Sequence, residues 1–354
     1  MLEPGVVFCN HCKKSFQNAY YRADNRRVGV DLMHTLKVFR KPVFKVIIAD
    51  DDCEEDFVRL AEPLPDNCDG CPERLVVQFD DEEENTIVHR ACPNCGHRIP
   101  LDRGKYKTAL IAVAGATASG KSSWLQALAV PEHYKFLDHA DYPVKFDFVS
   151  VGSGRSIDVA TALGSNGNSL RFFLSEKESG QPFVEVILMD AAGEHYSMGT
   201  DEFWHNLEIA DGIVYTEDIC KVLSGESDVT IYNNLNENGI TSRKPVAYLG
   251  THADLLLNKP EVLMDKHTNT PLFTRDTFYP DYSPSAVLGR SRLEEHILHQ
   301  LGVHLIHNAG HAFLIQSCVS DGTYNFHRAG TSMNIYDPLL YLLNQLNLMP
   351  IISK

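Results

Sequence analysis

The sequence has little positive charge and no long apolar segment. Its 32 Lys and Arg are outnumbered by 47 Asp and Glu, which gives a formal net charge of −15. A surface that coats nucleic acid needs clustered basic residues, so this balance argues against that class of function and leaves room only for a local basic patch. No apolar run reaches the roughly 20 residues of a membrane-spanning helix, and residues 1–10 lack a secretory pattern. We therefore expect a cytoplasmic protein without a membrane span.

The length and the cysteines indicate two domains. A chain of 354 residues with 44% hydrophobic residues is long enough for two packed units. Six of the nine cysteines form C-x-x-C pairs within the first hundred residues, and such pairs in a reducing compartment favour metal-binding thiolates. We expect a zinc-ribbon-like domain with an insertion over residues 1–104, and a second domain over residues 105–354.

Short apolar runs alternate with helix-like segments after residue 105. This alternation predicts an α/β fold with a mostly parallel sheet and helices on both of its faces. The predicted strands cover residues 109–114, 170–174, 183–189, 212–216, 245–249 and 312–316. The predicted helices cover residues 123–129, 201–209, a stretch near 228–236, 291–301 and 338–346. In the first domain, strands are predicted over residues 28–38, 43–48 and 75–79, and in the second an inserted loop near 255–290.

The most specific pattern is GATASGKS at residues 115–122, a G-x-x-x-x-G-K-S phosphate loop. A strand, a glycine-rich turn and a helix N-terminus in this order direct backbone N–H groups at an anion. Lys121 is expected to reach the outer phosphates and Ser122 to bind Mg²⁺. Gly115 and Gly120 are expected to let the backbone close around the phosphates. The other residues expected to contact the nucleotide here are Ala118, Ser119 and Ser123.

A second pattern follows the predicted strand 183–189, which ends in Asp-x-x-Gly. A carboxylate at the end of a buried strand beside a phosphate loop is placed to hold Mg²⁺, directly or through water. We expect this role for Asp190, and we expect the N–H group of Gly193 to approach a γ-phosphate.

The order of the phosphate loop, Asp190-Ala-Ala-Gly193-Glu194 and the segment 210–218 resembles that of Ras- and Rab-like GTPases of the TRAFAC class. In that family a water-orienting Gln follows the Asp-x-x-Gly motif, whereas this chain has Glu194, with His195 beside it as another candidate. The resemblance implies a P-loop G domain that hydrolyses GTP to GDP, with Lys121, Glu194 and His195 as catalytic candidates. It also implies an arginine finger supplied by a partner.

The base-recognition motif of that family is Asn or Thr, Lys, any residue and Asp, and residues 251–254 resemble it. Thr251 and Asp254 keep the family residues, whereas His252 replaces the Lys. Asp254 is able to accept hydrogen bonds from the ring N–H and the amino group of guanine, which adenine does not offer, so the motif favours GTP. An imidazole at His252 is able to stack on the base. A strand-to-helix cap is the alternative interpretation of the four residues.

Two weaker assignments complete the predicted nucleotide site. Ser317 and Cys318 resemble the family loop that closes over guanine, and a buried inert cysteine is the alternative for Cys318. The switch threonine that completes Mg²⁺ coordination is expected between residues 149 and 169. Thr161 is the candidate, with Ser156 and Ser165 as alternatives.

The pairs Cys9-x-x-Cys12 and Cys92-x-x-Cys95 resemble the two knuckles of a zinc ribbon. Four thiolates around tetrahedral Zn²⁺ leave no open position, so the predicted metal is structural, and without it the small domain should lose its fold. We favour these four ligands as one site. The pair formed by Cys68 and Cys71 also fits an ordinary ribbon spacing to Cys92, and a second site is compatible with Cys53, Cys68, Cys71 and either His89 or His11.

Together the patterns predict a Mg²⁺-dependent GTP-binding switch with a zinc ribbon as an interaction arm for protein partners. The combination, with the segment DPLLYLL at residues 337–343, resembles GTPases of bacterial conflict systems, including the double-GTPase group, which implies a role in antiviral defence. One alternative is a P-loop ATPase or kinase with Arg155 and Arg171 in a lid. Another is an adaptor whose nucleotide site is only structural.

Overall fold

The computed structural model of the protein divides into two compact units. Leu2–Lys107 form one unit, and Thr108–Lys354 form the other together with Met1. The structure describes residues 1–10, 12–17, 20–23, 43–48, 57–60, 74–78, 85–90, 92, 94, 99, 103–128, 144–148, 169–190, 201–226, 230–252, 311–314 and 335–349.

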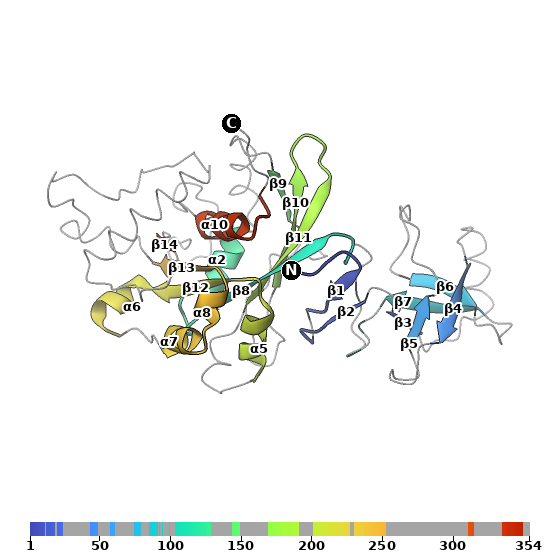
Figure 1. Ribbon diagram of the computed structural model, residues 1–354, viewed down its shortest axis with the longest axis horizontal. Helices are drawn as coiled ribbons and strands as arrows, with labels where there is room; N and C mark the ends of the chain where they lie inside the picture. The colour runs from blue at the N-terminus through green and yellow to red at the C-terminus, as the bar shows by residue number, and fades with distance from the viewer. Residues whose placement is uncertain are drawn as a thin grey trace. The chain divides into compact units, whose positions relative to one another are not determined.

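A mixed, mostly parallel sheet forms the centre of the larger unit (Figure 1). Its seven strands lie in the order β14-β13-β12-β8-β11-β10-β9, with β8 in the middle. The bounds are β8 Lys107–Gly115, β9 Val144–Phe148, β10 Ser169–Glu176, β11 Pro182–Asp190, β12 Gly212–Asp218, β13 Val246–Thr251 and β14 His311–Leu314. The six strands predicted for this part of the chain are therefore present, and β9 is an additional edge strand that the sequence analysis did not predict.

The two halves of the sheet differ in strand direction. β12 runs parallel to β8 and β13, and β13 runs parallel to β14, whereas β10 is antiparallel to both β11 and β9. The turn between β10 and β11 is too short for a parallel crossover, and it is closed by hydrogen bonds between Glu176 and both Gly180 and Gln181. The predicted mostly parallel sheet is confirmed, and the antiparallel pairing of β9, β10 and β11 at one edge was not predicted.

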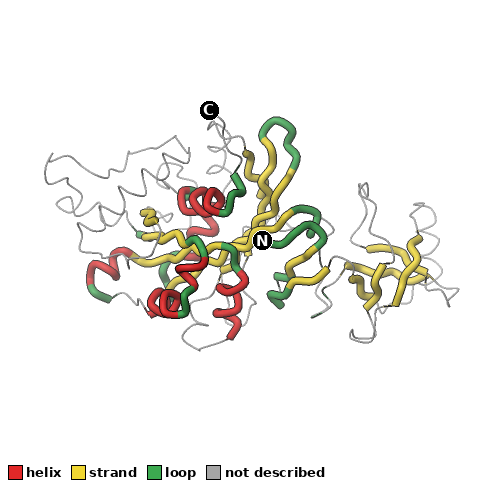
Figure 2. The backbone as a smooth tube through the Cα atoms, viewed as in Figure 1, coloured by secondary structure: helices red, strands yellow, loops and turns green. Residues whose placement is uncertain are grey.

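Helices cover both faces of this sheet (Figures 1 and 2). α2 and α10 lie on one side, and α5, α7 and α8 lie on the other. The bounds are α2 Lys121–Leu128, α5 Asp201–Ile209, α6 Ile219–Ser224, α7 Thr230–Glu237, α8 Ile240–Arg243 and α10 Asp337–Gln345. The predicted helix 291–301 and the inserted loop near 255–290 lie outside the described residues. Within the described part of the chain, no helix is long and apolar enough to cross a membrane.

Hydrogen bonds between buried side chains and the backbone attach α2 to the start of α10. Trp124 donates from its indole Nε1 to the carbonyl of Ile335 at 2.8 Å, and the Tyr336 hydroxyl donates to the carbonyl of Leu128 at 2.8 Å. Both rings belong to the core cluster that also contains alternate residues of β8. The helix that follows the phosphate loop is thereby fixed at its middle, by Trp124, and at its last residue, Leu128.

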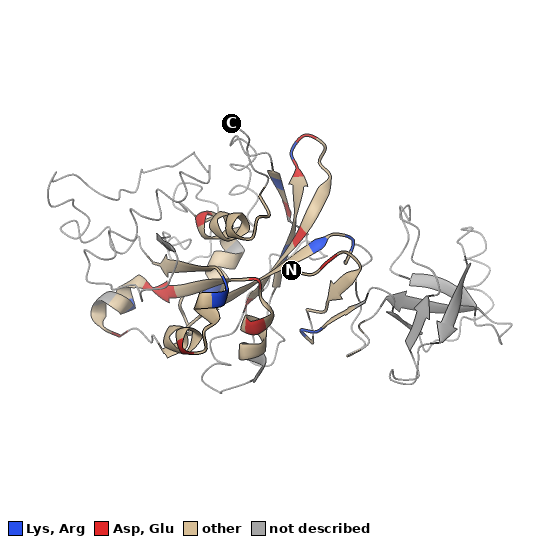
Figure 3. Cartoon of the chain, viewed as in Figure 1, with Lys and Arg blue, Asp and Glu red and all other residues tan. Residues whose placement is uncertain are grey.

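A buried ion pair connects β10 and β11. Arg171 Nε lies 2.5 Å from Glu185 Oε1, and the Thr108 hydroxyl of β8 donates to the other carboxylate oxygen at 3.0 Å. The alternative role of Arg171 in a mobile lid is therefore wrong, because its side chain is buried within the sheet; Arg155 lies outside the described residues. Elsewhere in the described part of the larger unit, Arg243 and Lys244 are neighbours in the chain, and the other Lys and Arg are spread singly along the ribbon (Figure 3).

The smaller unit consists of a hairpin and a barrel. The hairpin pairs β1 Val6–Phe8 with β2 Ser15–Gln17. The barrel is closed in the order β3-β5-β4-β6-β7, and its bounds are β3 Tyr20–Ala23, β4 Val43–Ile48, β5 Phe57–Leu60, β6 Arg74–Gln78 and β7 Asn85–Arg90. Two of its strands were predicted, β4 with the same bounds and β6 with bounds one residue earlier. The predicted strand 28–38 lies outside the described residues.

Three tyrosines pack together between β12, β13 and α7. The rings of Tyr215 and Tyr232 meet edge to face with centroids 5.0 Å apart, and those of Tyr215 and Tyr248 are 5.8 Å apart. Tyr248 donates a hydrogen bond to the carboxylate of Glu217. The Tyr232 hydroxyl has no hydrogen-bond partner among the described residues, and burial raises the pKa of Tyr232 to about 12.

We expect Tyr232→Phe to leave the free energy of unfolding unchanged or to raise it by up to about 1 kcal/mol, because it removes a buried hydroxyl that makes no hydrogen bond. The matched control Tyr248→Phe should lower the free energy by about 1–3 kcal/mol, because it takes a donor from the buried Glu217 carboxylate. Urea unfolding followed by circular dichroism measures both values. Equal destabilisation of the two variants would contradict this assignment.

Candidate functional site

The phosphate loop joins the central strand of the sheet to the first helix of the larger unit. β8 ends at Gly115 and α2 begins at Lys121. Within the loop, Ser119 donates its N–H to the carbonyl of Ala116 at 3.2 Å, and the helix begins with the bond from Trp124 N–H to the carbonyl of Gly120 at 2.9 Å. The predicted order of strand, loop and helix is confirmed.

Two glycines of this loop are required by neighbouring strands. A Cβ atom at Gly115 would lie 2.3 Å from the backbone oxygen of Thr216, and one at Gly120 would lie 3.0 Å from the Thr251 side chain. Both glycines have positive φ, 152° and 81° respectively. The loop therefore passes so close to the ends of β12 and β13 that a side chain at Gly115 does not fit.

The Lys121 side chain is folded back over the loop. Its Nζ donates to the carbonyls of Gly115 at 2.9 Å and Ala116 at 2.8 Å, and it lies 3.4 Å from Ser119 Oγ. Only 7% of Lys121 is exposed. These contacts hold a positive charge at the N-terminus of α2, where the helix dipole adds to the positive potential.

Two threonines hold Ser119 from neighbouring strands. Its hydroxyl lies 2.7 Å from the Thr216 hydroxyl of β12, and its carbonyl accepts a hydrogen bond from the Thr251 hydroxyl of β13 at 3.0 Å. Thr251 was predicted as a base-recognition residue. Thr216 was missed, and the only signal for it is a hydroxyl residue near the end of an otherwise apolar strand.

Oxygen ligands lie beside the loop. The hydroxyl of Ser122, in the first turn of α2, donates to Asp190 Oδ2 at 3.2 Å. Asp190 is the last residue of β11 and is 3% exposed. A hydroxyl and a carboxylate suit a hard cation such as Mg²⁺, which is usually held by one or two protein groups together with substrate phosphates. The structure thus brings the two predicted Mg²⁺ ligands Ser122 and Asp190 together.

The remaining predicted residues fall into two groups. Ala118 has a left-handed φ of 61°, Ser123 is half-buried in the first turn of α2, and His252 directly follows β13 with φ of 58°. The others lie outside the described residues: Thr161, Gly193, Glu194, His195, Asp254, Ser317 and Cys318 in the nucleotide site, and Cys95 in the zinc site.

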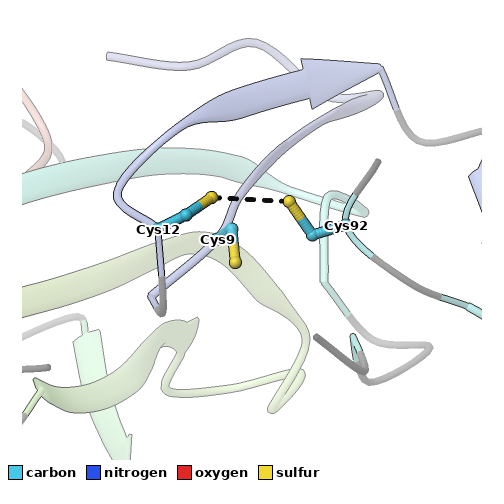
Figure 4. A group of neighbouring side chains, drawn as sticks. All are labelled: Cys9, Cys12 and Cys92. Carbon is cyan, nitrogen blue, oxygen red and sulfur yellow. Dashed lines mark hydrogen bonds between the residues drawn. The ribbon is translucent and has the colours of Figure 1, made fainter. Parts of the chain in front are cut away.

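The smaller unit contains a cysteine cluster (Figure 4). The sulfur atoms of Cys9, Cys12 and Cys92 all lie within 4.8 Å of one another, and those of Cys12 and Cys92 are 3.5 Å apart. Tetrahedral Zn²⁺ with Zn–S bonds of about 2.3 Å requires sulfur atoms about 3.8 Å apart. The cluster could therefore hold a metal ion such as zinc.

The backbone of the first knuckle supports this arrangement. Cys9 N–H donates to the carbonyl of Lys14 at 2.9 Å, Lys13 N–H donates to the carbonyl of Cys9 at 2.9 Å, and Lys13 has a left-handed φ of 57°. This tight turn places two sulfurs on one side of the hairpin. Arg103 adds a support, because its Nη2 donates to the carbonyl of Phe8 at 2.5 Å.

The thiols are crowded and buried. Cys9 and Cys92 are fully buried, and contact with the Cys9 thiol together with burial raises the pKa of Cys92 far above its ordinary value. Zinc binding requires thiolates, whose charge the cation compensates. Cys92 lies beside Cys9 and Cys12, so three of the four predicted zinc ligands are close together. Cys53, Cys68, Cys71 and His11, proposed for a second site, lie outside the described residues.

No protein-family model matches the chain, and no curated protein is significantly similar to it in sequence.

We expect Gly115→Ala to lower the free energy of unfolding by more than about 3 kcal/mol, because backbone strain adds to the overlap with the fixed oxygen of Thr216. Gly180→Ala is the matched control. Gly180 also has a positive φ of 65°, but a Cβ atom there meets nothing within 4 Å, so its cost should be about 1–2 kcal/mol. Similar losses in the two variants, measured by urea unfolding, would show that Thr216 does not confine the loop.

We expect the purified protein to contain zinc and Cys92→Ser to lose it, because the variant removes one of three clustered sulfur ligands. Cys220→Ser is the control, since Cys220 belongs to the larger unit and is absent from the cluster. Elemental analysis of both variants measures the metal content. Full zinc occupancy in Cys92→Ser would contradict the assignment.

Proposed function

We propose that the protein is a GTP-binding switch that hydrolyses GTP at the phosphate loop and carries a zinc-binding interaction arm. The observation that carries this proposal is the meeting of a buried lysine with a serine–aspartate pair around one glycine-rich loop. Lys121 supplies fixed positive charge, whereas Ser122 and Asp190, 3.2 Å apart, supply oxygen ligands. A triphosphate with Mg²⁺ is the ligand class that uses both features.

The order of the strands supports a P-loop G domain. From β8 the chain passes to the β9–β11 side of the sheet and then returns to β12 on the other side. Ligands of open α/β sheets bind outside the carboxyl ends of the strands where the strand order reverses. Gly115, Asp190 and Thr251 end β8, β11 and β13 respectively, so the residues assigned to the nucleotide end the strands next to this reversal.

The proposed chemistry is phosphoryl transfer to water, in which positioning and charge compensation do most of the work. Lys121 would bind the outer phosphates, and Ser122 and Asp190 would hold Mg²⁺, which neutralises negative charge on the phosphates. The resemblance to Ras- and Rab-like GTPases assigns the positioning of water to Glu194 or His195. Thr161 would be the switch threonine that completes the coordination of Mg²⁺.

The preference for guanine rests on Thr251, His252 and Asp254. Thr251 bonds the phosphate loop, so a base-recognition motif at this place lies next to a bound nucleotide. Asp254 would accept hydrogen bonds from guanine, with Ser317 and Cys318 in the loop that closes over the base.

The cysteine cluster would hold Zn²⁺ as a structural ion, and the unit around it would bind a protein partner. The setting in a bacterial defence system follows from the resemblance alone.

We expect Lys121→Ala to weaken GTP binding at least about tenfold, because it removes charged hydrogen bonds to the phosphates. Lys177→Ala is the control, since Lys177 is an exposed lysine in the β10–β11 turn. Titration with fluorescent GTP and ATP, together with a GDP-release assay, measures affinity, base preference and turnover. Unchanged affinity in Lys121→Ala would contradict the phosphate site, and equal affinity for ATP and GTP would contradict the guanine assignment.

A further inference from the structure

His252 lies between two strand ends that contact the phosphate loop. It follows β13, where Thr251 is paired in register with Asp218, the last residue of β12. The Nδ1 atom of His252 lies 3.4 Å from Asp218 Oδ2 and 3.2 Å from Thr251 Oγ1. The side chain of His252 is 34% exposed, and that of Asp218 is 15% exposed. One ring nitrogen therefore faces two protein oxygens, while part of the ring is open to a ligand.

The neighbours of Nδ1 determine where the ring proton lies. The Asp218 carboxylate only accepts hydrogen bonds. The single hydroxyl proton of Thr251 is directed at carbonyls, those of Ser119 at 3.0 Å and Glu217 at 3.1 Å, so toward Nδ1 this hydroxyl is also an acceptor. The acceptor oxygens beside it therefore favour the tautomer with the proton on Nδ1, and in the neutral ring Nε2 then keeps a lone pair.

Asp218 is itself held in place. Its Oδ1 accepts a hydrogen bond from the backbone N–H of Cys220 at 2.9 Å, which caps the N-terminus of α6. The Cys220 sulfur also lies 3.9 Å from the carbonyl of His252. The carboxylate thus has one oxygen fixed by the helix and the other directed at the ring, and the backbone of His252 is anchored to the same helix.

We propose that Asp218 is a positioning residue for nucleotide recognition, which directs the proton of the neutral form of His252 to Nδ1 so that Nε2 accepts a hydrogen bond from the nucleotide. This inference rests on the proposed nucleotide site. The donors that a guanine nucleotide offers include the guanine amino group and the ribose hydroxyls. A lysine, the residue of the GTPase family at this position, has donors only. His252 therefore places a hydrogen-bond acceptor where the family has a donor, and Asp218 keeps Nε2 an acceptor by holding the ring proton on Nδ1.

The test is the substitution Asp218→Asn. The amide oxygen is still able to cap Cys220, but the amide NH₂ group would then face Nδ1 and favour the tautomer with the proton on Nε2. At pH 8, with the nucleotide acceptor converted into a donor, GTP affinity should fall about tenfold, without an equal change in turnover at saturation. Nitrogen-15 NMR of labelled histidine should show the proton of His252 on Nδ1 in the wild type and on Nε2 in the variant.

Two further measurements separate positioning from a general structural effect. In a double-mutant cycle, Asp218→Asn should cost little affinity when it is added to His252→Ala, because both act through one ring. Nucleotide analogues identify the donor: inosine triphosphate lacks the amino group, and 2′-deoxy-GTP and 3′-deoxy-GTP each lack one hydroxyl. The analogue without the donor should bind the wild type and Asp218→Asn with equal affinity.

The outcomes distinguish this inference from the proposed function. If the wild type binds GTP and Asp218→Asn binds it equally well, the inference is overturned and the nucleotide site stands. An additive double-mutant cycle, or a tenfold difference that persists with all three analogues, also overturns it. If the wild type binds no guanine nucleotide, the proposed function fails, whereas the tautomer of His252 still shows whether Asp218 orients the ring.

Discussion

The candidate nucleotide site depends on the contact of two neighbouring strands with one residue of the phosphate loop. Thr216 binds the Ser119 side chain and Thr251 binds its carbonyl. Thr251 is the last residue of β13 and Thr216 lies two residues before the end of β12, and the two strands are parallel and in register. The shape of the loop is therefore determined by the pairing of the sheet, and it is this shape that brings the carbonyls of Gly115 and Ala116 to the Lys121 ammonium.

A loop fixed in this way is organised before any ligand arrives. Immobilising flexible groups on binding costs about 0.5–1.5 kcal/mol for each side chain, and the contacts of Ser119 with Thr216 and Thr251 lower that cost for this residue. The three donors of Lys121 face oxygens of the loop, so Lys121 has to exchange one of these contacts to reach a phosphate. The rigid loop also has an energetic cost, because Ala118 has a left-handed backbone with φ 61°. A non-glycine residue in that conformation costs of order 1–2 kcal/mol, and it persists because the surrounding structure determines the path of the loop.

The parts of this site that were predicted are those encoded in a continuous stretch of sequence. The phosphate loop and Asp190 follow apolar runs, so their places at strand ends were visible. Thr216 and Asp218 were not predicted, because their roles come from the register between β12 and its neighbours, which no local pattern encodes. The antiparallel pairing of β10 with β11 was not predicted for the same reason, since the apolar runs of these two strands look alike in a parallel and an antiparallel sheet.

The cysteine cluster combines a pair that is close in the sequence, Cys9 and Cys12, with Cys92, which is far from it in the sequence. Each C-x-x-C pair was visible in the sequence, but Cys12 and Cys92 are 80 residues apart, and closing a flexible loop of that length costs about 4 kcal/mol or more in chain entropy. The barrel reduces this cost. Its first and last strands pair with each other, Tyr21 opposite Arg90, so the inserted chain enters and leaves the barrel side by side. The fold of the insertion thus brings Cys92 back toward Cys9 and Cys12, and a metal ion at these three residues would only have to hold together ends that the barrel has already joined.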